Sequence, residues 1–214
     1  MATTTPSAVF TAPAEYVDSD HPTIVACATG LLATATGDPL VALYELVRDL
    51  PYAAGELEEL DTYRASTTLA AGHGHCVSKA ALLAALARAA GHPARVGYAD
   101  VRNHLASPRL LAAMGTDVFA WHGFTELWVG DRWVRVSPTF DRATCARFGV
   151  PPLTWDGVHD ALLQAFDGGG TMQYVAWHGS FHDVPARFLA AEMCRRYPFV
   201  RNGGISRFQR GDAA

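Results

Sequence analysis

Two residues, Cys76 and His122, carry the strongest chemical signal in this chain, a thiol followed along the sequence by an imidazole. Cys76 directly precedes an apolar helical pattern, so we expect its thiol in the first helical turn, where unpaired backbone N–H groups and the helix dipole favour an anion. A thiolate forms more readily there. A nucleophilic thiol also needs a base, and the segment 121–127 places His122 at the start of a predicted strand that can lie against this helix end. The pair predicts acyl-transfer chemistry.

The helix that begins at Cys76 is expected to occupy the centre of the fold. Its leucines recur at the helical period among helix-favouring alanines, and the pattern stops at Gly91. Two helices are expected before it. One begins at Pro22, and the other is capped by Asp38 and ends near Leu50. The cysteine therefore belongs to the last of three helices in the first half of the chain.

Three strands are predicted after this helix. Residues 94–101 form the first strand. The aromatic and β-branched runs 124–129 and 132–136 form an antiparallel hairpin with a turn at Gly130-Asp131. His122 is expected on the first strand of the hairpin or just before it. A sheet built in this way would carry the imidazole.

Other segments give weaker signals. Residues 102–119 are expected to form an irregular or helical excursion, with a short helix starting around Pro108. Beyond Pro138 the one strong signal is a helix capped by Asp183 that ends before Pro198. The chain after residue 138 is otherwise expected to be less regular.

Composition limits the class of protein. With 214 residues, 50% of them hydrophobic, the chain can bury a sizeable core, and we expect a single domain over residues 21–200 between a flexible lead-in, 1–20, and a flexible tail, 201–214. The net charge of −4 and the dispersed arginines argue against nucleic-acid binding. No apolar run is long enough for a membrane span and no secretory signal opens the chain, so we expect a cytoplasmic protein that does not bind membranes.

Neither disulfides nor metals are expected. No C-x-x-C pair is present. The closely spaced His73 and His75 lack further ligands nearby, so we predict no metal and no other cofactor. The four cysteines are widely spaced: Cys27, Cys76, Cys145 and Cys194.

Two longer motifs surround the thiol and the imidazole. Residues 74–80, with 88–95 after them, are similar to a G-x-C-x-x-x-A helix followed by R-x-x-G-x-P-A-R, while 122–127 and 133–139 are similar to an H-A-W-x-E strand and a W-x-x-x-D-P-T strand. In these motifs, which run from about residue 52 to 141, the chain resembles the transglutaminase-like superfamily. The resemblance implies an α+β fold with a transglutaminase-like or papain-like core, in which the helix bearing the cysteine packs against an antiparallel β-sheet. It also implies that Cys76 and His122 are catalytic.

The chain departs from the family at the third catalytic position. The family's aspartate in W-x-x-x-D-P-T aligns with Ser137, whose hydroxyl can accept a hydrogen bond from the histidine but carries no charge to stabilise an imidazolium. Asp141 stands four residues later, and we expect it, in preference to Ser137, to orient His122, because a charged partner holds the tautomer better. Glu126 is a further candidate, since alternation along a strand puts it on the same face as His122.

Each of these residues also has a structural interpretation. Free cysteine is commonly a small buried hydrophobe, although a glycine-rich turn flanked by histidines exposes the Cys76 thiol better than a core helix would. His122 can be an ordinary strand histidine, and His178, in a second Trp-His-Gly segment, is its main competitor as the base. Lys79 is expected to be an exposed residue of the first helical turn.

These residues predict a cysteine enzyme that forms a thioester on Cys76. Hydrolysis follows if water is the second nucleophile and transamidation follows if an amine is, and the sequence leaves both open. The expected substrate is a peptide, a protein or a small amide or thioester. Two alternatives remain: an inactive transglutaminase-like domain that binds peptides or a protein partner, which Ser137 favours, and a biosynthetic acyltransferase that takes its acyl group from a carrier-protein thioester.

Overall fold

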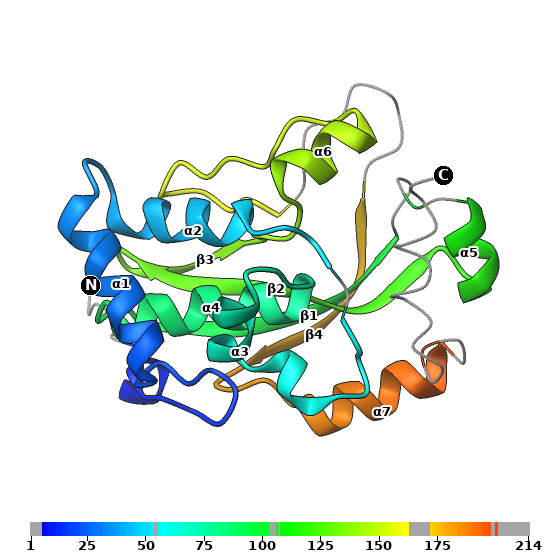
Figure 1. The fold of residues 1–214 in the computed structure, drawn as a ribbon, viewed down its shortest axis with the longest axis horizontal. Helices are drawn as coiled ribbons and strands as arrows, with labels where there is room; N and C mark the ends of the chain where they lie inside the picture. Colours follow the sequence, from blue (N-terminus) through cyan, green and yellow to red (C-terminus); the bar gives the residue numbers. More distant parts are fainter. Residues whose placement is uncertain are drawn as a thin grey trace.

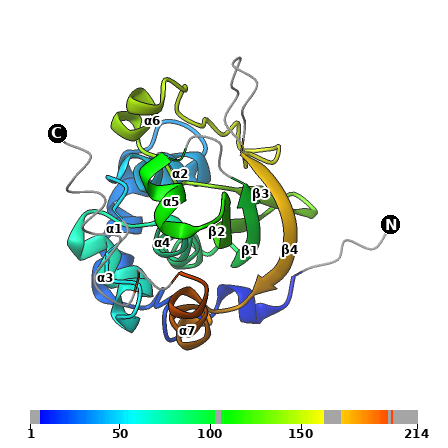
Figure 2. The ribbon, with the colours of Figure 1, turned by 90° about the vertical axis from the view of Figure 1, so that its right-hand side faces the viewer.

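A central helix, wrapped on one side by a curled sheet, organises the computed structural model (Figure 1, Figure 2). This helix, α4 (Cys76–Ala89), is buried along nearly all its length, including every alanine from Ala80 to Ala87. Neighbours enclose α4 from several sides, so its buried residues lie all round the helix rather than along one stripe. The structure describes residues 6–53, 55–102, 106, 108–162, 172–197 and 200.

The sheet is antiparallel, has four strands and runs in the order β3-β2-β1-β4. Figure 2 shows β4 arching around the side of α4 at the end of the sheet. Bulges interrupt the pairing of β1 with both of its neighbours between Tyr98 and Val101, and such bulges bend a sheet and increase its twist. The strands are β1 (Ala94–Arg102), β2 (Val118–Val129), β3 (Arg132–Val136) and β4 (Gln173–Phe181).

The remaining helices cover the side of α4 opposite the sheet and the ends of the fold (Figure 1). The helices α1, α2 and α3 pack against α4, while α5 lies at the far end of β2 and α7 lies below β4. Their bounds are α1 (Pro22–Thr34), α2 (Pro39–Asp49), α3 (Ala65–Ala71), α5 (Pro108–Met114), α6 (Arg142–Phe148) and α7 (Ala186–Arg196), with short 3-10 turns η1 (Ala8–Thr11) and η2 (Leu60–Tyr63).

The predicted α+β fold class is confirmed, as are the helices around the cysteine. The Asp38 carboxylate caps α2 by accepting the Leu40 N–H at 2.8 Å, as its sequence position predicts. The predicted hairpin is present as β2 and β3, with Trp128 opposite Trp133. Its first strand begins at Val118, earlier than expected, so His122 lies well inside a long strand.

Three elements were not predicted: α3, α6 and β4. The strand β4 pairs with β1 along its length but leaves alternate side chains exposed, among them Val175, Trp177 and Phe181. Its sequence contains a glycine and several small or polar residues, which weaken the strand pattern. Long-range pairing with β1, rather than local propensity, therefore decides this strand.

Asp183 has a different role from the predicted helix cap. Its carboxylate accepts the backbone N–H groups of Glu15, Tyr16 and Val17 at 2.9–3.1 Å, while Pro185 directly precedes α7. Tyr16 and Val17, within the predicted lead-in, are buried in the core. The predicted tail, 201–214, lies outside the described residues.

Candidate active site

Strand β2 passes directly against the first turn of α4, and glycine makes this approach possible. A Cβ atom on Gly123 would lie 2.7 Å from the Cα atom of Val77 and 3.2 Å from the carbonyl oxygen of Cys76. Both distances are too short for any larger residue unless the backbone moves. Gly123 therefore fixes the distance between the strand that carries His122 and the helix that carries Cys76.

Cys76 is the first residue of α4, and its side chain keeps some exposure. Burial raises the pKa of the Cys76 thiol above its ordinary value, while the backbone N–H groups of Gly123, Val77 and Cys76 itself and the charge of Lys79 act in the opposite direction. Burial outweighs the N–H groups, in contrast to the readily formed thiolate that the helix position predicts. The resting thiol is therefore protonated, and a base is needed to activate it.

His122 provides a neutral imidazole at this point. It is buried inside β2, and burial lowers its pKa to about 4, so the ring can accept a proton at neutral pH. Its Nε2 atom lies 3.4 Å from the Ser137 hydroxyl oxygen, which lies 2.9 Å from the hydroxyl of Thr139. The N–H group of Gly123 reaches the thiol and His122 directly precedes Gly123, so the strand residue that carries the imidazole lies next to the backbone that contacts the thiol.

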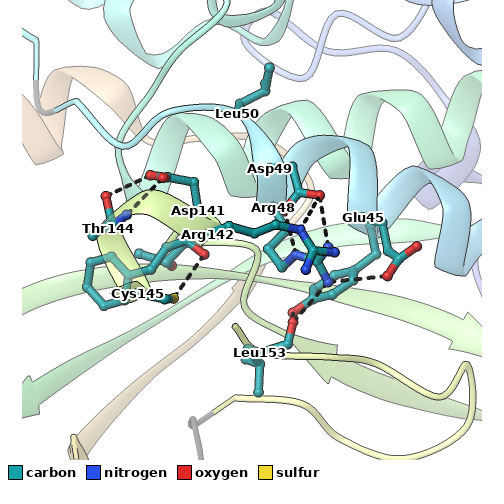
Figure 3. A network of polar contacts seen from close by, with 12 residues as sticks. Glu45, Arg48, Asp49, Leu50, Asp141, Arg142, Thr144, Cys145 and Leu153 are labelled. Carbon is teal, nitrogen blue, oxygen red and sulfur yellow. Dashed lines mark hydrogen bonds and ion pairs between the residues drawn. The ribbon is translucent and has the colours of Figure 1, made fainter. Parts of the chain in front are cut away.

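Asp141 has other partners (Figure 3). It caps α6, where one carboxylate oxygen accepts the Thr144 N–H at 2.9 Å and the other accepts the Thr144 hydroxyl at 2.7 Å and the Tyr52 N–H at 2.8 Å. Burial works to raise its pKa, but these hydrogen bonds and the charge of Lys79 lower it overall. The geometry therefore favours Ser137, and not the expected Asp141, as the neighbour of His122.

Glu126 is also committed elsewhere. Its buried carboxylate forms ion pairs with Arg95 and, at 3.1 Å, with Arg135. Both arginines flank it on the same sheet, because Arg95 and Arg135 are its partners on β1 and β3. The sequence periodicity placed Glu126 on the expected strand but did not reveal these two cations.

Lys79 is fully buried, so its predicted exposure is wrong. Its ammonium donates to the carbonyl oxygens of Arg48 at 3.0 Å, Leu50 at 2.7 Å and Thr139 at 2.8 Å. Burial lowers its pKa to about 7, and Asp141 and Asp49 oppose that shift. Lys79 therefore joins α4 to the end of α2 and to the segment that carries Ser137.

His178, the competing histidine, belongs to a separate cluster on β4. Its Nε2 atom lies 2.6 Å from the Asp100 carboxylate, and its ring stacks on Trp121 with centroids 4.1 Å apart. Trp121 has a φ of +55°, an unusual value for a side chain of this size, and donates its N–H to Asp100 at 3.0 Å. His178 thus has a charged partner, and its cluster fixes the residue just before His122.

Four buried tyrosine hydroxyls lie within electrostatic range of the thiol, and no motif in the chain indicated them. Burial raises the pKa of each, with a smaller contribution from Cys76, so all remain protonated at neutral pH. They come from four separate parts of the chain: Tyr52, Tyr63, Tyr98 and Tyr174.

Within the part of the chain that the structure describes, no three metal-binding side chains are grouped together and no helix has the length and apolar character to cross a bilayer. All four cysteines lie in that part and none forms a disulfide.

A thiol at the start of a central helix, beside an imidazole on a curled antiparallel sheet, defines the papain-like class of α+β folds. The family model of the transglutaminase-like superfamily matches residues 26–138, more than half of the chain, and the chain belongs to this superfamily. No curated protein matches the sequence.

One solved structure supports the fold. It is a protein from Cytophaga hutchinsonii described as a candidate cysteine protease, which is 19% identical and superposes with a TM-score of 0.51. The match covers 81% of this chain and 46% of that one, so the chain spans about half the length of its structural relative.

Proposed function

We propose that this protein is a cysteine enzyme that transfers acyl groups or hydrolyses amides through a thioester on Cys76. The observation that carries the proposal is the close approach of Gly123, which directly follows His122, to the first turn of α4, which begins at Cys76. Membership of the transglutaminase-like superfamily supports it. The substrate class is a peptide, a protein or a small amide or thioester.

In the proposed reaction His122 takes the thiol proton as sulfur attacks the substrate carbonyl carbon. A sulfur–carbon bond forms, and the resulting oxyanion is stabilised by backbone N–H groups near the start of α4. The carbonyl then re-forms, the bond to the leaving amine or thiol breaks, and His122 returns the proton to that leaving group. Water or an amine attacks the thioester in the second half of the reaction and regenerates Cys76.

Ser137 takes the place of the acid in this proposal. Since the His122 Nε2 atom faces the Ser137 hydroxyl, we assign the exchange of protons with the thiol to Nδ1. Ser137 accepts the Nε2 hydrogen and holds the ring in that tautomer. It adds no charge, so the imidazolium is less stable than it would be beside a carboxylate.

Alkylation with chloroacetamide, followed by intact-mass measurement and peptide mapping, tests the proposal. We expect one adduct at Cys76 in the folded wild-type protein and none there in Cys76→Ala. Cys194→Ala is the matched control, because Cys194 is also partly exposed but lies on α7. Equal labelling of both cysteines at rates typical of free thiols would contradict an activated Cys76.

The second candidate is a binding domain without turnover, which the uncharged Ser137 and the raised pKa of Cys76 favour. The two candidates separate in a reaction with p-nitrophenyl acetate. An enzyme accumulates or turns over an acyl group on Cys76, which mass measurement detects at early times. A binding domain releases nitrophenol no faster than Cys76→Ala does.

A further inference from the structure

Tyr174, at the start of β4, covers the imidazole of the site. Its ring meets the His122 ring edge-on, with centroids 6.1 Å apart and an interplanar angle of 76°. On its other side it stacks on Trp177 at 4.9 Å, almost parallel. Pairing of Tyr174 with Val101 fixes the backbone beneath the ring. The ring therefore has a defined place beside His122, although it belongs to the far edge of the sheet.

The hydroxyl of Tyr174 is buried and has no hydrogen-bond partner of good geometry. A buried polar group without a partner costs folding free energy, and native proteins contain few of them. The hydroxyl lies beside Ser137 and within electrostatic range of Cys76, and burial above all raises its pKa. It is thus a neutral donor with the Ser137 hydroxyl within reach but with no well-aligned acceptor in the resting site.

Because position 137 carries no acid, a neutral donor near the thiol can supply stabilisation that the family's aspartate would otherwise give. When His122 takes the thiol proton, an anion and a cation form together, and the hydroxyl of Ser137 adds no charge to stabilise the cation. Stabilisation must then come from the side of the anion. A tyrosine O–H is a strong donor to an anionic acceptor in a dry site.

We propose that Tyr174 is an active-site residue whose hydroxyl donates a hydrogen bond to the thiolate of Cys76. This inference rests on the proposed function. The thiol proton passes to His122 and the tyrosine keeps its own proton, so no bond to Tyr174 breaks. The hydrogen bond is absent while the thiol is protonated and forms as the charge develops. Tyr174 thereby raises the fraction of reactive thiolate.

Tyr98 also has a buried hydroxyl without a partner and lies within range of Cys76. Its ring contacts Trp121 and Phe181 and it pairs with Gly123, so it occupies a different side of the site. No ring contact joins it to His122 among the described residues. Tyr174, rather than Tyr98, is therefore assigned as the donor to the Cys76 thiolate.

The test compares Tyr174→Phe with wild type in the pH dependence of Cys76 alkylation by chloroacetamide. Phenylalanine keeps the ring against His122 and Trp177 and removes only the hydroxyl. We expect the alkylation rate at pH 7 to fall roughly tenfold and the midpoint of the profile to rise by about one pH unit, since each unit changes the thiolate fraction tenfold. Tyr16→Phe, a buried tyrosine beside Glu15 and Arg64, is the control and should match wild type.

A profile of Tyr174→Phe identical to wild type would overturn this inference and leave the proposed function standing. Absence of selective labelling in wild type would instead overturn the proposed function. A second measurement uses the unmutated protein: the ζ-carbon resonance of Tyr174 in labelled protein should shift over the pH range in which alkylation accelerates. A resonance that stays constant over that range would contradict the hydrogen bond.

Discussion

The chain contains two Trp-His-Gly segments, and the fold places them on either side of the same strand. Residues 121–123 lie on β2 and residues 177–179 on β4, and Tyr98 of β1 pairs with Gly123 on one side and Gly179 on the other. The first histidine has a hydroxyl partner, whereas the second has a carboxylate at 2.6 Å. The carboxylate that a catalytic triad would use therefore accompanies the other histidine.

Under the proposed function, a histidine–carboxylate pair does not by itself mark the reactive site. His178 is stacked on an indole and bonded to Asp100, a carboxylate that also accepts the backbone N–H of Trp121. His122 lies beside the helix that presents a thiol, and burial lowers its pKa and keeps it neutral. The proposed function therefore assigns the roles of base and support by position relative to the thiol, and not by the strength of the partner.

The largest expected effect separates the two histidines. His122→Ala should lower the rate of Cys76 alkylation at pH 7 by about a hundredfold or more, because it removes the proposed general base. His178→Ala should lower it only a few-fold, through a less well-fixed Trp121. Rate constants come from intact-mass time courses, with thermal melts to confirm folding. A loss in His178→Ala as large as that in His122→Ala would reverse the assignment.

Lys79→Met tests the hydrogen bonds that hold the segment next to His122. Methionine fills similar space but leaves the carbonyl groups of Arg48, Leu50 and Thr139 without their donor, so we expect the free energy of unfolding to fall by about 3 kcal/mol. Denaturant titration measures it.

Lys79→Met should change the surroundings of His122 but not those of His178. The His122 resonances should change because Thr139 carries the hydroxyl next to Ser137, while those of His178 stay constant. Lys79→Arg is the comparison variant, because it keeps a positive charge and N–H donors but presents them from a larger, planar guanidinium. Unchanged stability in Lys79→Met would show that the three hydrogen bonds contribute little.

Ser137→Asp gives the first histidine the kind of partner that the second one has. A carboxylate beside Nε2 should raise the pKa of His122 from about 4 by roughly one to two units. Imidazole titration by NMR measures this shift, with His178 as the internal control. The rate of Cys76 alkylation should rise together with the pKa, whereas an unchanged His122 titration would place Ser137 outside its reach.

The sequence predicted the parts of the site that depend on local pattern. The Gly-x-Cys helix start and the strand carrying His122 are short-range signals, and both are present in the structure. The acid was harder to assign, because Asp141 stands near the right place in the chain yet its carboxylate caps α6. Helix α6 is short and went unpredicted, so its cap looked like an available acid.

Long-range packing decided the rest. Lys79 is buried because carbonyl groups from two distant segments converge on it, and no local pattern reports that convergence. Tyr174 reaches the site from a strand whose pairing with β1 spans more than seventy residues of sequence. The roles of such residues can be recognised only from the folded structure, in which the sheet curls around α4.

The smallest expected effect concerns Asp141. Its carboxylate caps α6 and holds the Tyr52 N–H, so Asp141→Ala should lower the free energy of unfolding by about 1–2 kcal/mol. The pKa of Asp141 in the folded protein is below the ordinary 3.8, so the difference from wild type should be full above that value and disappear as pH falls through the lowered pKa. Denaturant titrations at several pH values measure it, with Asp38→Ala as the matched cap control on α2. Since the hydrogen bonds of Asp141 to Thr144 and Tyr52 leave it a structural role, the pH profile of Cys76 alkylation should keep its midpoint in Asp141→Ala. A shifted midpoint with unchanged stability would instead show that Asp141 acts on the His122 imidazole.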